Sequence, residues 1–592
     1  MRTERYHHPP LLQDAGVIVA FLVVGLVSLV WYFAHAKYFL TNRQCAEFLC
    51  YFSILGLGLL CGIWLVVTAR SRRESEWPHP YLAISPQRDA RNCREAWSQD
   101  GVVLGHDVHG EPWVWQDRVR VMQGIVLGMT GMGKTTLLKN IITQDLNRVV
   151  GTPDDPHRIP MVIFDGKGDL EFFQDLLPHI HHASRLNDLR VLNPARPDIS
   201  VRYNPLYVTD ESYYEHVNFI FESFGLRRDF FKGHQATYFG DLVRVLFYTG
   251  KRFNIYDVLV VALDQQVLEE QMEKAKARIE RLHLPHDQRR LNFDMSARNL
   301  LQSFADRERV EKIQGLLNEL MAFLEDKLSV ITGPYEDLLT LDEVIDQELI
   351  LFVSLNVNVN SRAVTALGRM LLQNLQLMVG KRYENQGTDS PFVSVILDEF
   401  SPFAYANFAQ ILQTARGTNI ALLFSLQSIS QLLKVSPGFC NDVSSAPNTV
   451  MLLRARDEET TRYFENASSL VEGKRLTMTI EEKGIFDRRY EQIGFGSETQ
   501  IKETRAQDYH LKNLPVGQFQ ILMTNNKLGT EFSHLHVRLS PTVELECFEP
   551  MIFPRTATPN IFTEGANLRF KDPAVVERRA RLKGRGQQVK LS

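Results

Sequence analysis

The feature that most constrains this chain is the stretch Gly128–Thr136, which reads GMTGMGKTT. A short apolar run, Gly124–Leu127, precedes it and suits a buried parallel strand. The residues that follow, Leu137 to Val149, have the composition of a helix. A strand, a glycine-rich loop and a helix in this order form a phosphate-binding loop. The sequence therefore predicts an α/β fold with a nucleotide phosphate site at the start of a helix.

Each residue type in this loop has a chemical reason. Glycines let successive backbone N–H groups curl around a phosphate chain, and the helix N-terminus adds its positive dipole end. Lys134 brings a point charge to the β- and γ-phosphates, and the Thr135 hydroxyl is a ligand for Mg²⁺. We therefore predict a site for ATP and Mg²⁺ with these nucleotide-binding residues: Gly128, Thr130, Gly131, Met132, Gly133, Lys134, Thr135 and Thr136.

A second apolar run, Val393–Leu397, ends in the acidic pair Asp398 and Glu399. Acidic residues at the carboxyl end of a strand lie where doubly wound sheets bind ligands. We predict that Asp398 belongs to the Mg²⁺ site together with Thr135. Glu399 is predicted to orient and deprotonate the attacking water. The alternative is a surface Asp-Glu pair that closes an ordinary strand.

Further runs complete a sheet: Met161–Asp165, Leu349–Leu355, Ala421–Leu426, Thr449–Leu453 and Phe519–Met523. Most are largely apolar, as expected of strands that are covered on both faces. Gln427 directly follows one of them. We predict that Gln427 contacts the γ-phosphate and relays its loss, although a plain strand-end glutamine would look the same in the sequence.

The distance between the two motifs indicates an insertion. A minimal nucleotide-binding fold does not need the 264 positions that separate Lys134 from Asp398. Much of this stretch has the charged faces and periodic apolar positions of helices. We predict an all-α domain inserted at 207–346, between two parts of a nucleotide-binding domain at 76–206 and 347–540.

Two uncharged apolar stretches, 15–34 and 48–67, precede this fold. Each has the length of about 20 residues that a helix needs to cross a bilayer. Arginines before the first stretch and after the second favour a cytoplasmic position for both ends. We predict that residues 1–75 form a membrane anchor of two transmembrane helices. A cleaved signal peptide is the alternative for the first stretch, but its apolar run is longer than a signal core.

The charge of the chain excludes a globally basic nucleic-acid coat, because 66 Lys and Arg face 70 Asp and Glu. A local basic patch remains in the C-terminal tail predicted at 541–592, where residues 566–592 carry eight Lys or Arg and two acidic residues. This tail is either a solvated end or a docking segment for nucleic acid or an acidic partner.

Several motifs accompany the phosphate loop: LGHDVHG at 104–110, FDGKG at 164–168, YNPL at 203–206, VILDEF at 395–400, ARGTN at 415–419, LQSISQL at 426–432, ETR at 503–505 and LPVG at 514–517. With the two apolar spans, they make the chain resemble the type IV coupling proteins of bacterial conjugation and secretion, the TraD/TraG group of membrane-anchored ATPases. The likeness covers most of the chain and is most specific between Val395 and Leu432.

The resemblance implies a RecA-like P-loop ATPase that forms a homo-hexamer around a DNA channel in the bacterial inner membrane, with the ATPase domain in the cytoplasm. The implied partners are single-stranded DNA, a relaxase, the type IV secretion channel and the lipid bilayer. Arg416, 18 residues after Asp398, matches an arginine that reaches the neighbouring subunit's nucleotide as a finger. A residue that caps a helix or pairs with a nearby acid is the alternative for Arg416.

The leading hypothesis is therefore an ATP-driven coupling protein that recruits a relaxase–DNA complex and pumps single-stranded DNA to the channel. A receptor-type coupling protein that docks protein cargo is a second hypothesis. An FtsK-like double-strand translocase is a third, although little chain follows Pro541 for its usual DNA reader. The short loop between the spans and the short C-terminal extension depart from the family pattern. The short loop puts in doubt the extent of contact with the periplasmic part of the channel, and the short extension leads us to expect no large separate cargo-binding domain.

Overall fold

The structure is a computed structural model that describes residues 96–541, 543 and 566–571, except for 153–154, 169, 208–212, 227–230, 283–287, 325, 357–360, 386–389, 469, 478–479, 483–489, 493–496 and 526–528. The chain divides into two compact units, Met1–Leu82 and Ala83–Ser592, and all described residues belong to the second. The two predicted membrane spans lie outside the described residues. Within the described part, none of the helices has the length and apolar character to cross a bilayer.

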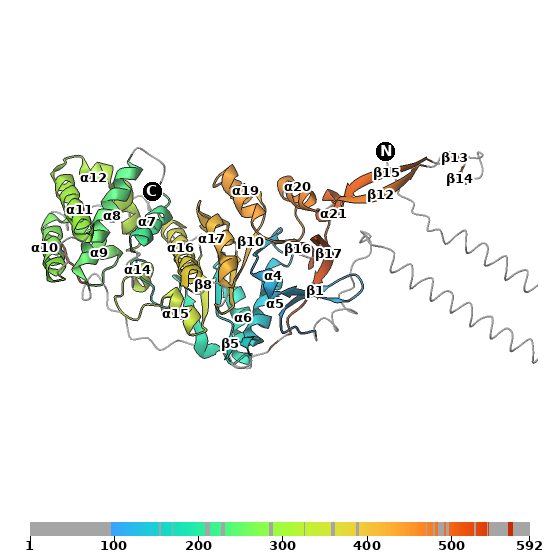
Figure 1. The fold of residues 1–592 in the computed structure, drawn as a ribbon, viewed down its shortest axis with the longest axis horizontal. Coiled ribbons are helices and arrows are strands. Elements are labelled where there is room, and N and C mark those ends of the chain that lie inside the picture. Colours follow the sequence, from blue (N-terminus) through green and yellow to red (C-terminus); the bar gives the residue numbers. More distant parts are fainter. Residues whose placement is uncertain are drawn as a thin grey trace, which may run out of the picture. The chain divides into compact units, whose positions relative to one another are not determined.

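An eleven-stranded sheet forms the centre of this unit (Figure 1). In spatial order its strands are β2 (Pro112–Gln116), β1 (Gly101–His106), β17 (Gly529–Val537), β16 (Gln518–Asn525), β11 (Thr449–Leu452), β3 (Gly124–Leu127), β10 (Ile420–Leu426), β9 (Val393–Asp398), β6 (Met161–Asp165), β8 (Ile350–Ser354) and β7 (Leu189–Leu192). The α/β class predicted from the sequence is confirmed.

The sheet has a parallel and an antiparallel part. All neighbours from β11 to β7 pair in parallel, whereas β16, β17, β1 and β2 continue the sheet in antiparallel pairs. Every residue of β3, β9 and β10 is buried. This burial explains why the sequence of these strands is nearly continuous in apolar residues. The phosphate-loop strand β3 lies between β11 and β10, and β10 separates it from β9.

Each face of the sheet packs against its own hydrophobic core. Ile125 and Leu127 of β3 belong to one core, and Val126 between them belongs to the other. The second core contains apolar residues of α5 (Lys134–Asn147) and α6 (Leu170–His182). Helices of the first core that lie against the strands are α16 (Ser361–Asn385), α17 (Phe408–Thr414) and α19 (Pro437–Ser445).

Short elements connect these layers. The helical ones are α4 (Asp117–Arg120), η1 (Leu186–Asp188), η3 (Ser401–Phe403), η4 (Ala415–Thr418), α18 (Ser430–Leu433), α20 (Glu458–Ala467) and α21 (Asp508–Leu511). Three strand pairs stand apart from the main sheet: β4 (Val149–Thr152) with β5 (Asp155–Arg158), β12 (Leu470–Thr477) with β15 (Ser497–Thr504), and β13 (Ile480–Glu482) with β14 (Tyr490–Gln492).

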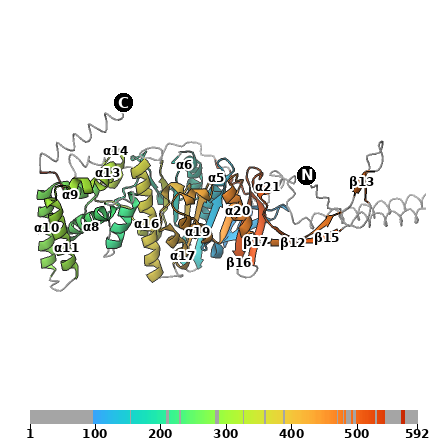
Figure 2. The same ribbon diagram turned by 90° about the horizontal axis from the view of Figure 1, so that it is seen from above.

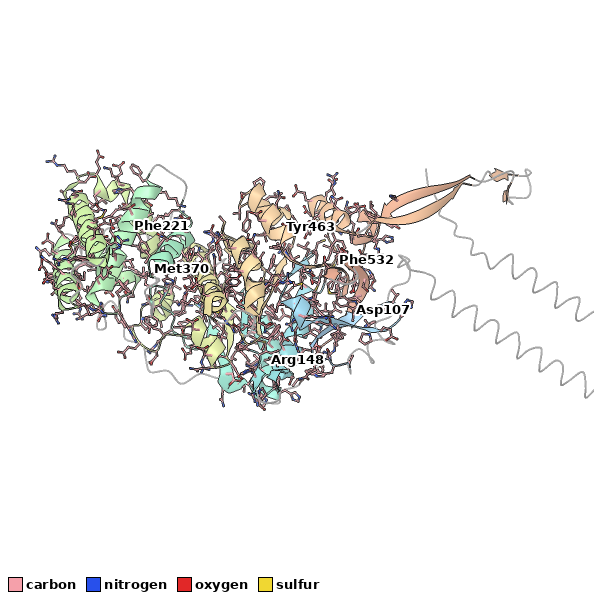
Figure 3. All side chains as sticks on the ribbon, in the orientation of Figure 1. Asp107, Arg148, Phe221, Met370, Tyr463 and Phe532 are labelled. Atoms are coloured by element: carbon pink, nitrogen blue, oxygen red, sulfur yellow. The ribbon has the colours of Figure 1, made fainter. Side chains whose placement is uncertain are left out.

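Helices fill the chain between β7 and β8: α7 (Tyr213–Ser223), α8 (Lys232–Thr249), α9 (Ile255–Leu263), α10 (Gln265–Arg281), α11 (Gln288–Ala305), α12 (Arg309–Lys312), α13 (Gln314–Ala322), α14 (Asp326–Thr332) and α15 (Leu341–Asp346). We call α7 to α15 the helical region. In both ribbon views α16 lies between α8 of the helical region and the strands (Figures 1 and 2). Phe221 of α7 and Met370 of α16, both labelled in Figure 3, are buried in one continuous core.

Candidate nucleotide site

The loop after β3 has the backbone that its glycines permit. Gly131 and Gly133 have φ angles of +78° and +104°, in the left-handed region that side chains disfavour. Gly133 is the residue before α5, so Lys134 begins the helix. A Cβ atom at Gly133 would lie 3.4 Å from Cα of Gly517, whose N–H donates to the carbonyl of Met132 (3.1 Å). The segment Leu514–Gly517 therefore braces the phosphate loop.

The predicted loop residues differ in exposure. The side chain of Thr130 is exposed at the loop tip, Met132 is half-buried, and Thr136 on the first turn of α5 is exposed. Gly128 lies at the end of β3, where its N–H donates to the carbonyl of Leu426 (3.2 Å). The tip of the loop is thus accessible, while its two ends are fixed to the strands around it.

Lys134 is almost completely buried, with 4% of its surface exposed. Its Nζ donates to the carbonyl of Gly128, within its own loop. Burial lowers the pKa of Lys134, and the carboxylates of Glu399 and Asp398 oppose this shift. The ammonium group therefore lies in a water-poor place and faces two acidic side chains.

Thr135 and Asp398 meet across the intervening strand β10. The Thr135 hydroxyl donates to Oδ2 of Asp398 at 3.3 Å. The other carboxylate oxygen, Oδ1, accepts a hydrogen bond from the Ser425 hydroxyl at 2.6 Å. Asp398 is buried, and Ser425 of β10 fixes its orientation. A hydroxyl and a carboxylate side by side provide the oxygen ligands that Mg²⁺ prefers.

Glu399 leaves the strand with a strained backbone. Its φ angle is +53°, which is uncommon for a residue other than glycine and concentrates at functional sites. The backbone N–H of Glu399 donates to the Ser425 hydroxyl (3.0 Å). Its carboxylate accepts from Nε2 of Gln427 (3.1 Å to Oε1) and lies 3.9 Å from Nζ of Lys167. The structure therefore brings Glu399 and Gln427 together and adds a lysine to them.

Arg416 lies at the opposite end of the strands. It belongs to η4, which leads into β10, whereas Gln427 follows the end of β10. The seven residues of β10 span about 20 Å at 3.3 Å per step. The Arg416 side chain is exposed, and among the residues that the structure describes it forms no ion pair and no side-chain hydrogen bond. Arg416 therefore does not reach the phosphate loop of its own chain.

Two residues of this site were not predicted from the sequence, Ser425 and Lys167. Ser425 of β10 precedes Gln427, the residue after the strand, by two positions, and period-two alternation could have placed both on the same face. Lys167 stands in the FDGKG motif at the end of β6, which was noted for its family pattern and not for a role. Parallel pairing of β6 with β9 brings Asp165 opposite Asp398, and this pairing explains why Lys167 lies near Glu399.

The arrangement defines a class of protein. A glycine-rich loop that joins a parallel strand to a helix, faced by a carboxylate at the end of the strand next but one, is the phosphate site of a P-loop protein with an α/β core. The family model described as "Type IV secretory system Conjugative DNA transfer" matches residues 160–468. The chain belongs to this family, and its predicted kinship with type IV coupling proteins is confirmed. The matched range contains Asp398, Glu399, Arg416 and Gln427 but begins after the phosphate loop.

Solved structures with the same fold belong to the bacterial conjugative coupling protein TrwB. The unbound form of TrwB, without its first 70 residues, has a TM-score of 0.51 and 14% identity, over 77% of this chain and 92% of that one. TrwB in complex with the non-hydrolysable ATP analogue ADPNP has a TM-score of 0.50 and 14% identity, over 77% of this chain and 93% of that one. At this identity the likeness concerns the fold. A comparison with curated protein sequences gave no match.

Proposed function

We propose that this chain is an ATP-driven coupling protein that recruits a relaxase–DNA complex and pumps single-stranded DNA to a type IV secretion channel during conjugation. The observation that carries the proposal is the 3.3 Å contact between Thr135 and Asp398 in a chain of the conjugative DNA transfer family. This contact unites the loop hydroxyl and the strand-end carboxylate that hold Mg²⁺ in P-loop nucleotidases.

The residues present fit ATP and Mg²⁺. A side chain at Gly131 would meet no atom within 4 Å, so the loop tip leaves room for phosphates. Lys134 donates to a carbonyl of its own loop, and a phosphate oxygen can replace that carbonyl. Thr135 and Asp398 are the residues that would hold Mg²⁺, which supplies positive charge against the β- and γ-phosphate oxygens. The ADPNP complex of TrwB, a protein of the same fold, supports this assignment.

In the proposed reaction Glu399 takes the proton of the attacking water. Its backbone is fixed by Ser425, and its carboxylate is held between Gln427 and Lys167. A base held in this way is already oriented for proton transfer before the reaction begins. Gln427 lies at the end of β10 beside Glu399, where its amide can exchange Glu399 for the γ-phosphate. Its loss of that contact after hydrolysis would then change the loop that begins at Gln427.

The position of Arg416 supports a ring of identical subunits. An exposed arginine on the far edge of the strands cannot serve its own phosphate loop, but it can serve the loop of a neighbour. In trans it would stabilise the charge that develops on the transferring γ-phosphate. We therefore propose a homo-hexamer in which each Arg416 completes the next subunit's site.

The remaining predictions belong to the same proposal. Residues 1–75 are proposed to anchor the ring in the bacterial inner membrane, and 207–346 to form a separate all-α domain between the two parts of the nucleotide-binding domain at 76–206 and 347–540. The tail at 541–592 follows them. Single-stranded DNA would pass through the ring toward the secretion channel.

ATP hydrolysis by the full-length chain in detergent micelles tests the proposal. We expect single-stranded DNA to raise the hydrolysis rate and double-stranded DNA to raise it less. Lys134→Ala should abolish both rates, because it removes the charge that faces the phosphates. Lys139→Ala, on the next turn of the same helix and paired with Asp175 at the surface, is the matched control and should retain them.

Three outcomes distinguish the hypotheses. Hydrolysis that DNA does not change would contradict the DNA pump and favour a receptor for protein cargo. Stronger stimulation by double-stranded than by single-stranded DNA would favour an FtsK-like translocase. Hydrolysis that survives Lys134→Ala would show that the nucleotide site itself is wrongly assigned.

A further inference from the structure

A short segment near the C-terminus lies against the helical region. Ala566, Leu568 and Phe570 pack on the same hydrophobic core as α7 to α15. The ring of Phe570 meets the ring of Tyr256 edge-on, with centroids 6.1 Å apart. These three side chains alternate with Asn567, Arg569 and Lys571, which are exposed. The segment Ala566–Lys571 therefore lies on the helices with one apolar face, and it forms neither a helix nor a strand.

Side chains of the helical region hold the backbone of this segment. Three backbone N–H groups donate to them: Asn567 N to Oη of Tyr335 (3.0 Å), Leu568 N to Oδ1 of Asp257 (3.1 Å) and Lys571 N to Oδ2 of Asp264 (2.6 Å). Backbone groups are common to all peptides. Recognition through them binds an extended chain whatever its sequence, while pockets for alternate side chains select the sequence.

Both carboxylates have a second task at a helix start. Oδ2 of Asp257 accepts from Asn254 N in the capping box that begins α9, so Oδ1 faces Leu568. Oδ1 of Asp264 accepts from the first N–H groups of α10, and Oδ2 faces Lys571. Asp257 and Asp264 are completely buried. The caps hold both side chains in place, so the acceptors for the segment are positioned by the helices themselves.

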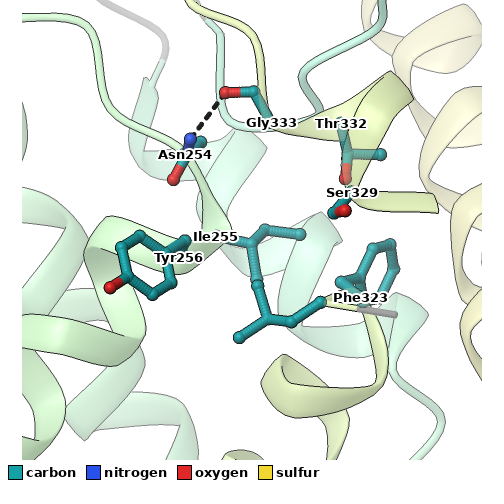
Figure 4. A pocket seen from close by; sticks show the side chains of 8 residues that line it. Asn254, Ile255, Tyr256, Phe323, Ser329, Thr332 and Gly333 are labelled. Carbon is teal, nitrogen blue, oxygen red and sulfur yellow. Dashed lines mark hydrogen bonds between the residues drawn. The ribbon is translucent and has the colours of Figure 1, made fainter. Parts of the chain in front are cut away.

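The start of α9 and the turn that carries Tyr335, which together form this surface, are also held to each other. Nδ2 of Asn254 donates to the carbonyl of Gly333 at 2.6 Å, which ties the start of α9 to the turn that carries Tyr335 (Figure 4). Asn254 and Tyr256 also line a small pocket with Phe323, Ser329 and Thr332 (Figure 4). Two elements that are distant in sequence therefore form one preorganised surface.

We propose that this surface is a peptide-binding site, which we call the tail groove. It fits a peptide with three apolar residues at alternate positions, the third of them aromatic, and a lysine directly after the aromatic residue. The chain's own segment Ala566–Lys571 occupies the tail groove in cis. Glu270 completes the specificity, because it forms an ion pair with Nζ of Lys571. Any other peptide of this pattern has to displace the resident segment.

The test uses the full-length chain and a fluorescent peptide with the sequence GANLRFKD, which copies residues 565–572. A tethered segment competes at an effective concentration on the order of 1 mM. We therefore expect the double variant Leu568→Asp, Phe570→Asp to bind the peptide at least 10-fold more tightly than the parental chain. Arg569→Lys, an exposed change in the same segment, is the matched control and should bind like the parental chain. A peptide in which Asp replaces both Leu568 and Phe570 should bind neither the parental chain nor the double variant.

Two results would overturn the proposal. One is equal binding of the peptide to the parental chain and to the double variant. The other is no binding to either up to 1 mM, while the double variant keeps the parental melting temperature. A charge exchange adds an independent measurement. Adding Glu270→Lys to the double variant should lower its affinity for the peptide a few-fold. A peptide that carries the Lys571→Glu change should restore that affinity. The change is small because both partners are half-exposed.

Discussion

The two edges of the parallel strands contrast. At the carboxyl edge Lys134, Thr135, Asp398 and Glu399 gather around an accessible loop, and Glu399 keeps a strained backbone. At the amino edge a buried network joins Arg120, Asp145 and Arg148. Arg120 is 2% exposed, and its guanidinium donates to both oxygens of Asp145 (2.8 and 2.5 Å). The charged side chains of the amino-edge network thus pair with one another, whereas those at the carboxyl edge surround a loop that a ligand can reach.

The environment of Arg120 shows how complete this enclosure is. Its guanidinium lies 5.6 Å from the ring centre of Trp115 and 5.1 Å from that of Phe392. Burial opposes the charged form, yet the carboxylates of Asp145 and Asp117 raise the pKa of Arg120 above its usual range. Burial also opposes the ionised form of Asp145, but the charge of Arg120 lowers its pKa overall. This network joins α4 to α5, and Arg120 also donates to the hydroxyl of Ser394 in β9 (3.4 Å).

Arg416, at the same end of the strands, differs from this network because it is charged and exposed. This difference teaches that a cation with no ion pair or hydrogen bond among the described residues is worth testing for a role in another subunit. The following predictions challenge the division between the two edges, from the largest expected effect to the smallest.

Replacement of Arg416 by Ala should reduce ATP hydrolysis by about 10³–10⁵-fold, as for arginine fingers of other nucleotidases. The fold should remain, since the side chain is exposed. Gln413→Ala, exposed on the preceding helix α17, is the control and should stay near the parental rate. Normal hydrolysis by Arg416→Ala would end the idea of a finger.

A mixing experiment asks whether Arg416 acts in trans. Arg416→Ala and Lys134→Ala subunits should each be inactive alone. Mixed rings contain interfaces that join an intact Lys134 to an intact Arg416, so part of the ATPase activity should return. If mixing restores nothing while wild-type subunits titrated into either variant give activity in proportion to intact interfaces, action in trans is refuted.

Glu399→Gln should leave nucleotide bound and slow hydrolysis by about 10²–10⁴-fold, because only the proton acceptor is lost. Nucleotide binding and single-turnover hydrolysis measure the two effects separately. Asp442→Asn, an exposed acid on α19, is the matched control. Turnover at the parental rate in Glu399→Gln would contradict the assignment of Glu399 as the base.

Arg120→Met should lower the free energy of unfolding by about 3–5 kcal/mol, since it leaves the buried Asp145 without its main partner. The double variant Arg120→Met, Asp145→Leu should recover much of this loss. Urea unfolding followed by tryptophan fluorescence measures both, with the exposed Arg118→Ala as control. ATP hydrolysis per folded molecule should not change. A loss of hydrolysis in the folded variant would contradict the claim that the amino-edge network serves stability alone.

Acidification should weaken the carboxyl edge first. His534 of β17 faces Gln518 (2.8 Å), which adjoins the brace at Gly517. Burial lowers the pKa of His534 from 6.5 to about 4. The unfolded chain therefore binds a proton between these pH values that the folded chain refuses, and stability falls as the pH falls from about 6.5 to about 4. We expect His534→Gln to remove about 2 kcal/mol of the loss between pH 7.5 and 5, measured by urea unfolding at both values. An unchanged pH dependence would contradict the assignment.

The sequence predicted the parallel strands well, because strands covered on both faces must be apolar throughout. Met161–Asp165 is the predicted run to the residue, and the predicted run at 449–453 is β11 with one residue more. The order of the strands could not be read in this way. The contact of Thr135 with Asp398 depends on β10 lying between β3 and β9, and no local pattern encodes that neighbour. The position of Lys167 near Glu399 likewise followed only once the pairing of β6 with β9 was known.

The tail groove was not predicted for a similar reason. The sequence left the basic tail either solvated or docked on nucleic acid or an acidic partner, and it gave no sign that residues 566–571 contact helices of their own chain. Their acceptors, Asp257 and Asp264, look in the sequence like ordinary helix caps, which they also are. A single sequence does not reveal that the second oxygen of each carboxylate serves a segment about 300 positions away.

The pairing of β1 with β17 sets an order of events during synthesis. These strands come from the first and last parts of the described sheet, and Trp115 and Thr449, joined by a hydrogen bond, are 334 positions apart. The sheet cannot close before almost the whole chain has left the ribosome, whereas the contacts among α8 to α11 are complete much earlier. We expect the helical region to fold before the C-terminal segment that braces the phosphate loop has been synthesised. Nascent chains halted before residue 500 should therefore contain folded helices and lack a formed nucleotide site.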